Sequence, residues 1–476
     1  MIDIDQIRAG RSELLERTNE LANDFLDEVV DRPVARPVDF DQLLAEMRAE
    51  GLPIDGDDPK QIIEHLANLA DRTVVGTAGP RYFGFVVGGS LPVTVAADWL
   101  TSVWDQNAAF YAHSPLAAAA EQISAEWLVQ LFGLAPGTSV GFVSGGTMAN
   151  FTGLAAGRHA LLAQLGWDVE RQGLFGAPEI TVVTSDESHI SIFASLQMLG
   201  LGSERVVRVP ADDQGRMRSD QLRTILAGIK TPVLVCAQAG NVNTGSFDPI
   251  AEIAAGVREY PSWLHIDGAF GLWAAASPVH QSLAEGIELA DSVSVDCHKW
   301  LNVPYDSGLI FVRDAAAHQA AMTLNASYYV TARRTERDNC NWVPEASRRA
   351  RGFAVYAALR FLGRQGIAQL IDNCCARARQ MAGRLAQAPR VTILNEVVLN
   401  QVLVRFSDPS GKDDDEFTAK VIGRVQEDGT CWLGGTIWHD MHAMRISISN
   451  WSTTEKDIDL SSQAILRCAG DTAAAC

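Results

Sequence analysis

The fold is most readily inferred from the stretch SVSVDCHKW, residues 292–300. Its first four residues alternate serine and valine, which is typical of a short β-strand, and a histidine and a lysine follow soon after. Similar short runs recur along the chain and are separated by longer stretches with helical periodicity. This alternation predicts an α/β protein with a mostly parallel sheet. The other predicted strands are 139–143, 180–184, 232–236, 263–266 and 308–312.

Three regions of different character make up the chain. Residues 1–79 carry apolar side chains at helical spacing, such as Leu21 and Phe25, and predict a helical N-terminal segment. Residues 80–355 contain the six predicted strands and would form a large domain. Residues 356–476 read as a smaller α+β domain. A helix around 353–364 leads into it, and its further predicted elements are helices at 371–387 and 415–427 and strands at 391–395, 401–406 and 443–448.

The composition limits the classes of protein that fit this chain. Of its 476 residues 47% are hydrophobic and 20% are charged, as in soluble globular proteins. No apolar run approaches the ~20 residues that span a bilayer, and the N-terminus lacks the apolar core of a secretory signal, so we expect a cytoplasmic protein without a membrane segment. A net charge of −19 argues against a nucleic-acid partner. The eight cysteines lack paired spacing, which predicts reduced thiols and no metal site.

A glycine pair follows the first predicted strand. Strand 139–143 runs into Ser144-Gly145-Gly146-Thr147 and then into an Ala- and Leu-rich helical stretch. Glycines at such a turn let the backbone approach a ligand, and the start of a helix offers free N–H groups to an anion. The turn could therefore hold a phosphate, with the Thr147 hydroxyl as a further donor. The same pattern also suits a plain tight connection, so residues elsewhere must decide.

Chemically versatile side chains follow three further predicted strands. His189 comes after strand 180–184, Asp267 ends strand 263–266, and His298 and Lys299 follow strand 292–295. Alone, each has an ordinary interpretation as a packed histidine, a turn-capping aspartate or a partly buried surface lysine. Ligands collect at the carboxyl ends of the strands in open α/β sheets, so their recurrence there indicates a site.

These residue types suit an aldehyde cofactor with a pyridine ring, pyridoxal 5'-phosphate. A positioned, partly desolvated lysine such as Lys299 can form a Schiff base with the aldehyde. A carboxylate such as Asp267 favours a protonated ring nitrogen and so makes the ring a better electron sink. His189 could stack on one ring face, Gly268-Ala269 would leave the ring uncrowded, and His298 would contact the phosphate.

At these residues the sequence resembles the group II pyridoxal-phosphate-dependent amino-acid decarboxylases, which include aromatic-L-amino-acid and glutamate decarboxylases. The resemblance runs from about residue 80 to the end and implies pyridoxal-phosphate fold type I, the aspartate-aminotransferase-like architecture. It also implies a homodimer whose N-terminal helices wrap the partner subunit. The motifs that carry it are Pro80-Arg81-Tyr82-Phe83, Ser114-Pro115, Ser144-Gly145-Gly146-Thr147, Ser185-Asp186-Glu187-Ser188-His189, Asn243-Thr244-Gly245-Ser246-Phe247-Asp248, His265-Ile266-Asp267-Gly268-Ala269 and Asp296-Cys297-His298-Lys299-Trp300.

The resemblance also implies a role for each matching residue. Catalytic roles fall on Lys299 as the Schiff-base lysine, Asp267 at the ring nitrogen, His189 over the ring, and Tyr328 on a loop that reaches the neighbouring subunit's site. The implied cofactor contacts are Gly145, Gly146, Thr147, His189, Asp267, Ala269, His298 and Lys299.

The expected reaction is α-decarboxylation of an L-amino acid to an amine and carbon dioxide. An aromatic substrate is the first choice, because Phe85, Val86, Phe110 and Tyr111 could line an apolar pocket. Where aromatic-acid decarboxylases have an aromatic residue followed by Pro-Thr, this chain has residues 85–89, FVVGG, so the side-chain preference stays open.

Other functions compete with decarboxylation as interpretations of this sequence. A carbon–carbon lyase resembling sphingosine-phosphate lyase, or an oxidative aldehyde synthase, would use the same scaffold and differ in products. A non-catalytic relative is disfavoured because Lys299, Asp267 and His189 are all present. An NAD-type dehydrogenase is disfavoured because no G-x-G-x-x-G opens a helix after the first strand.

Overall fold

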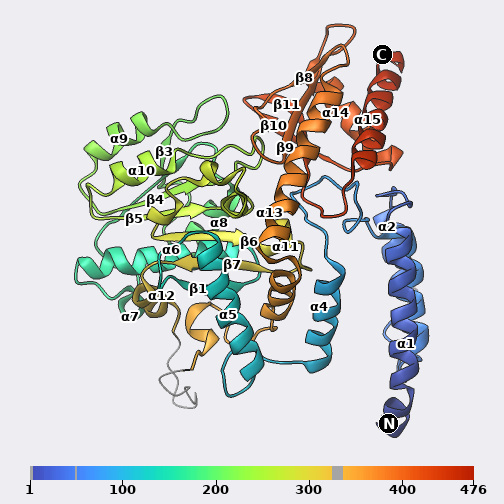
Figure 1. The fold of residues 1–476 in the computed structure, drawn as a ribbon, viewed down its shortest axis with the longest axis horizontal. Coiled ribbons are helices and arrows are strands. Elements are labelled where there is room, and N and C mark those ends of the chain that lie inside the picture. The colour runs from blue at the N-terminus through green and yellow to red at the C-terminus, as the bar shows by residue number, and fades with distance from the viewer. Residues whose placement is uncertain (1–3, 49–50, 324–335, 476) are drawn as a thin grey trace.

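The computed structural model describes residues 4–48, 51–323 and 336–475 of the chain. Figure 1 shows a large sheet with helices on both sides, a small sheet at the top of the view, and a long N-terminal helix along one edge. The α/β class predicted from the sequence is confirmed.

The large sheet has seven strands in the order β1-β7-β6-β5-β4-β2-β3. Strands β2 to β6 pair in parallel, whereas β7 runs antiparallel to both of its neighbours, β1 and β6. Strands β1, β4, β6 and β7 are buried along their whole length because helices cover both faces. All six predicted strands are present within two residues of their predicted ends. The strands are β1 Ser139–Val143, β2 Thr181–Ser185, β3 Val207–Val209, β4 Val233–Gln238, β5 Ser262–Asp267, β6 Ser292–Asp296 and β7 Gly308–Val312.

Helices connect these strands and cover the sheet. The helix that begins at the glycine pair, α6, packs across β4 to β7, and its many alanines and glycines allow this close approach. Three short 3₁₀ segments follow β5 in place of a full crossover helix, and the four-residue helix α11 follows β6. The helices of this part are α5 Pro115–Leu131, α6 Gly146–Gln164, α7 Val169–Gln172, α8 Ile190–Met198, α9 Ser219–Gly228, α10 Ile250–Val257, α11 Cys297–Trp300 and α12 Ala315–Met322, with 3₁₀ helices η1 Gly271–Ala276, η2 Gln281–Ala284, η3 Ile287–Leu289 and η4 Asn339–Trp342.

The C-terminal part is a four-stranded antiparallel sheet in the order β10-β11-β9-β8, packed with three helices. The sequence predicted a gap between helices at 365–370, but the chain is helical there. The break lies instead at Gly363, whose φ of 58° leaves the helical region. Strand β10 was not predicted. The elements are α13 Gly352–Leu385, α14 Asp414–Asp428, α15 Glu455–Ala475, β8 Val391–Ile393, β9 Gln401–Phe406, β10 Gly434–Trp438 and β11 Met441–Ser447.

The N-terminal segment is helical, as predicted. Ion pairs join α1 to α3, with Lys60 Nζ 2.8 Å from a Glu13 carboxylate oxygen and Arg17 Nε 2.5 Å from Glu64. No helix within residues 4–48, 51–323 and 336–475 is long and apolar enough to cross a bilayer. The helices are α1 Ile4–Glu28, α2 Phe40–Arg48 and α3 Pro59–Thr73, and α4 Pro92–Trp104 follows this segment.

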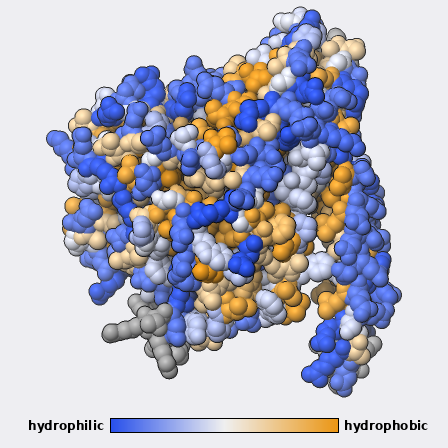
Figure 2. All heavy atoms as spheres, viewed as in Figure 1, coloured by the Kyte–Doolittle hydropathy of each residue, from blue (hydrophilic) through white to orange (hydrophobic). Residues whose placement is uncertain are grey.

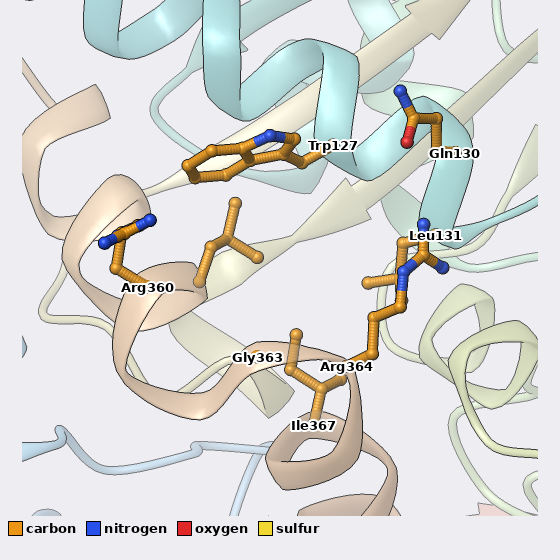
Figure 3. Close-up of a pocket in the computed structure, with 8 residues that line it drawn as sticks. Trp127, Gln130, Leu131, Arg360, Gly363, Arg364 and Ile367 are labelled. Carbon is orange, nitrogen blue, oxygen red and sulfur yellow. The ribbon is translucent and has the colours of Figure 1, made fainter.

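The break in α13 borders a cavity of about 300 Å³. In Figure 3 the Trp127 indole of α5 lies on one side of this hollow, and Arg364 and Ile367 of α13 lie on the other. None of its lining residues ends a strand of the large sheet. This cavity is therefore separate from the predicted site, which lies at the carboxyl edge of that sheet.

Candidate active site

Lys299 lies one turn beyond β6, on the short helix α11. Its Nζ is 2.8 Å from Oδ2 of Asp296, the last residue of that strand. The Lys299 side chain is 18% exposed and that of Asp296 is 3% exposed. The lysine amine is thus held at the sheet edge by a buried carboxylate while part of it stays accessible to a ligand.

Asp267 ends β5, the strand beside β6, and accepts several hydrogen bonds. Asn150 Nδ2 donates to its Oδ2 at 2.9 Å, Ser191 Oγ donates to the same oxygen at 3.3 Å, and the Ala269 backbone N–H donates to Oδ1 at 3.1 Å. Burial alone would raise the pKa of Asp267, but the charges of His189 and Lys299 and the Asn150 hydrogen bond lower it. The carboxyl group is therefore kept ionised inside the protein.

A chain of buried side chains holds Asn150 in this orientation. Because the Asn150 amide N–H₂ faces Asp267, its oxygen faces His265 Nε2 at 2.9 Å. Burial lowers the pKa of His265 to about 4, so the ring is neutral, carries its hydrogen on Nε2 and accepts from Ser292 Oγ on Nδ1 at 2.8 Å. This arrangement was not predicted. The clue in the sequence was a histidine two residues before Asp267, inside a buried strand.

His189 caps the start of α8, next to Asp267. The Ser191 backbone N–H donates to its Nδ1 at 3.2 Å, which leaves the ring hydrogen on Nε2. Burial lowers the pKa of His189, so the ring is neutral near pH 7. The residue nevertheless keeps solvent-exposed surface. A planar ligand could stack there.

The predicted phosphate turn meets the lysine segment directly. A Cβ atom on Gly145 would lie 3.0 Å from His298 Cε1, and one on Gly146 would lie 3.0 Å from Asp296 Oδ2. Glycine is needed because a larger residue would push these groups apart. Helix α6 begins here, so its first N–H groups and the Thr147 hydroxyl are available to an anion.

His298 is oriented by the loop that follows α11. The Ser307 backbone N–H donates to His298 Nδ1 at 3.0 Å, and the Tyr305 ring stacks on the imidazole with centroids 4.2 Å apart. Burial lowers the pKa of His298, so its hydrogen lies on Nε2, on the side of Gly145 and Asp296. Neither Tyr305 nor Ser307 was predicted to take part.

The four predicted substrate residues fall into two groups. A Cβ on Gly88 would collide with the Lys299 carbonyl, so the segment with Phe85 and Val86 lies against the lysine. The Phe85 ring lies 5.5 Å from Trp432 and is 62% exposed, whereas Val86 is buried. Phe110 packs on His113, and the Tyr111 N–H donates to Asp338 at 3.0 Å, so these two lie on a separate segment. Within the described ranges, no hydrogen bond joins Tyr111 to Lys299, His189 or Asp267. The predicted Tyr328 lies outside the described residues.

A further cation, Arg445, reaches this edge from the small sheet. It lies on β11 and donates to Asn243 Oδ1 at 3.3 Å. Burial lowers its pKa, and its charge contributes to the lowered pKa of His189. Arg445 was not predicted to take part, although an arginine inside the largely apolar run 443–448 could have indicated it.

The residues at this edge suit pyridoxal phosphate. A glycine turn at a helix start lies against Asp296, which pairs with the Lys299 amine, and the ionised carboxylate of Asp267 lies on the neighbouring strand. The Oδ1 atom of Asp296 is buried and has no hydrogen-bond partner within the described part of the chain, so a polar group is expected beside it.

Comparisons with known proteins agree with this arrangement. Residues 42–407 match the pyridoxal-dependent decarboxylase conserved domain. The chain is 27% identical over 452 residues to an aromatic-L-amino-acid decarboxylase of Bacillus atrophaeus, covering 93% of this chain and 92% of that protein. It is 29% identical over 393 residues to an L-2,4-diaminobutyrate decarboxylase of Rhizobium meliloti (strain 1021), covering 80% and 76%. The crystal structure of mouse CSAD has the same fold, with a TM-score of 0.89 at 23% identity over 97% of this chain and 99% of that chain.

Proposed function

This chain belongs to the pyridoxal-dependent decarboxylase family, and from that premise we propose that it converts an aromatic L-amino acid to its amine and carbon dioxide. As a member it is a pyridoxal-phosphate-dependent carboxy-lyase of fold type I. The observation that carries the proposal is the meeting of Lys299, Asp267 and His189 at one edge of the sheet, beside the turn of Gly145 and Gly146.

Each residue of the edge has a distinct task in this proposal. Pyridoxal phosphate, when bound, supplies an electron sink for the electrons that carbon dioxide leaves behind. Lys299 would hold the aldehyde group of the cofactor through its amine, and Asp267 would face the ring nitrogen and favour its protonated form. His189 covers one face of the ring. The remaining cofactor contacts are Gly145, Gly146, Thr147, Ala269 and His298.

Arg445 is suited to bind the carboxylate of the substrate. Its guanidinium is partly desolvated and close enough to affect the pKa of His189, and a buried guanidinium binds a carboxylate strongly through paired N–H groups. Arg445 would in this way hold the substrate carboxylate on the His189 side of the site.

We propose an aromatic substrate because aromatic residues lie on and beside the segment 82–88, whose last residue packs against the Lys299 carbonyl. Tyr82 stacks on Trp432 with centroids 5.1 Å apart, and Phe85 packs on the same indole. Ring edges and faces of this kind favour another aromatic ring. We assign Phe85 and Val86 to this wall and keep Phe110 and Tyr111 as candidates that a second subunit could bring closer.

A homodimer is part of the proposal. Large apolar side chains lie exposed on α3 and α4, with Val103 65%, Leu66 50% and Trp99 41% exposed. Figure 2 shows hydrophobic residues gathered on the face that carries α4 and the first half of α13. Contiguous apolar surface of this kind is typical of a subunit interface.

A product assay tests the function. Purified protein loaded with pyridoxal phosphate would be incubated with aromatic, acidic and diamino acids separately, and products identified by mass. We expect an amine one carbon dioxide lighter from an aromatic substrate, and none from the matched Lys299→Ala variant. Turnover of only diaminobutyrate or acidic substrates would overturn the aromatic assignment, and turnover by Lys299→Ala would overturn the role of the lysine.

A further inference from the structure

Asp296 places a carboxylate against the turn that is proposed to hold a phosphate. It is the last residue of β6, directly before the helix with Lys299. Its Oδ2 is 3.0 Å and its Oδ1 3.5 Å from the position of a Cβ on Gly146. Its side chain is almost fully buried. A phosphate bound at the start of α6 would therefore meet a second anion.

Only one of the two carboxylate oxygens of Asp296 has a hydrogen-bond partner within the described residues. Oδ2 pairs with Lys299 Nζ at 2.8 Å. Oδ1 has no hydrogen bond within the described residues, and the nearest cationic candidate, His298 Nε2, is 3.6 Å away. Burial keeps the His298 ring neutral by lowering its pKa. A buried oxygen without a donor is unfavourable, and a proton shared with an incoming ligand would satisfy it.

We propose, building on the cofactor site of the proposed function, that Asp296 shares one proton with the cofactor's phosphate, so that cofactor binding takes up a proton. A phosphate monoester loses its second proton near pH 6. Above that pH the free cofactor carries a doubly charged phosphate. Binding beside the Asp296 carboxylate then takes one proton from solvent, which forms an O–H···O bond between the two anions. One carboxylate, one phosphate dianion and one proton from solvent therefore combine in the bound state.

The other titratable groups around Asp296 change charge outside the relevant pH range. Burial lowers the pKa of both His298 and His189, so each is neutral above about pH 7. Burial raises the pKa of Tyr305 to about 12 and raises the pKa of the Cys297 thiol. Lys299 is the remaining charged neighbour, and a Lys299→Ala background removes both its charge and the covalent bond to the cofactor.

The test measures cofactor affinity, not activity. Equilibrium dialysis would give Kd for pyridoxal phosphate between about pH 7 and 8.5 in full-length Lys299→Ala and in Lys299→Ala with Asp296→Asn. We expect Kd of the first protein to rise about tenfold per pH unit, the slope for one proton. The asparagine variant should bind the dianion directly, with a flat profile and affinity at least about tenfold tighter near pH 8.

Pyridoxal, which lacks the phosphate, is the matched control ligand. It has the same ring nitrogen, so any pH dependence that comes from that nitrogen appears with both ligands, and its affinity should be insensitive to Asp296→Asn. If Lys299→Ala binds pyridoxal phosphate no better than pyridoxal, the phosphate site itself is misassigned and the proposed cofactor site fails. If the phosphate matters but both proteins show the same slope, only the role of Asp296 is overturned.

Calorimetry covers the case in which Asp296→Asn does not fold. Binding of pyridoxal phosphate to Lys299→Ala at pH 8, measured in two buffers of different ionisation enthalpy, gives the number of protons taken up. We expect a value close to one. A value close to zero would overturn the inference without any substitution at residue 296.

Discussion

The replacement Asp267→Asn tests the central electrostatic argument. The carboxylate accepts hydrogen bonds on both oxygens, from Asn150 and Ser191 on Oδ2 and from the Ala269 N–H on Oδ1. An asparagine must direct its own N–H₂ group at one of these donors. Two opposed donors in a buried place cost about 1–3 kcal/mol of folding free energy.

The effect on catalysis should be larger than the effect on folding. Two opposite unit charges ~4 Å apart attract by about 4 kcal/mol at an effective dielectric constant near 20. Asparagine removes this attraction for a proton on the ring nitrogen. If most of it is expressed in the transition state, kcat falls by about a thousandfold.

The assay combines kcat at saturating cofactor, the absorbance of bound cofactor and thermal unfolding. Asp248→Asn is the matched control, because Asp248 is also buried and accepts two backbone N–H bonds, from Met217 at 2.7 Å and Gln238 at 2.8 Å. It should change stability without changing the cofactor spectrum. An Asp267→Asn protein that binds cofactor and keeps kcat within tenfold of wild type would refute the reasoning.

Four further outcomes are expected. Borohydride should fix the cofactor covalently on Lys299, and peptide mapping that finds the adduct on another lysine would contradict the assignment. Light scattering should give a homodimer, whereas a fully active monomer would exclude it. Tyr328→Phe should move the aerobic products from amine towards aldehyde and peroxide, because the phenol is expected to protonate the α-carbon. A double variant with Tyr329→Phe allows for a shift of the loop by one residue. A wild-type product ratio in the double variant would exclude both phenols as the proton donor. Burial raises the pKa of Asp248 to about 7, so the folded state holds a proton that the unfolded state releases above about pH 4. Thermal stability should therefore fall as the pH rises from about 4 to 7, and Asp248→Asn should make this fall smaller. The same pH dependence in Asp248→Asn would show that Asp248 does not titrate in this range.

Local patterns were sufficient to predict most of the large sheet. Strand 139–143 and its glycine turn follow from β-branched residues and glycines that are adjacent in sequence. The short strand β3 and the position of the break in α13 were not predictable in this way. A three-residue strand carries little periodic signal, and the break at Gly363 depends on how α13 packs.

Some residues of the candidate site could likewise be predicted from local sequence, and others could not. Residues that stand directly after strands, such as Lys299 and Asp267, could be named from the sequence, and their chemical roles stay predictions. Asn150 could not be found, because its contact with His265 joins helix α6 to strand β5 across 115 positions of sequence. Asp296 stood inside a recognised motif, yet its ion pair with Lys299 appears only once the chain turns into α11.

The antiparallel strand β7 sets the spacing of the cofactor's anchor points. Neighbouring strands lie about 4.8 Å apart, so the ends of β1 and β6 are separated by about 10 Å with β7 between them, and the end of β5 lies one interval further on. Since β7 runs the other way, it contributes its first residue to this edge, and that residue is Gly308, packed on Gly145. The middle position therefore presents no side chain. The residues proposed to hold the cofactor therefore lie on either side of a position without a side chain, and the backbone hydrogen bonds of the sheet fix their separation.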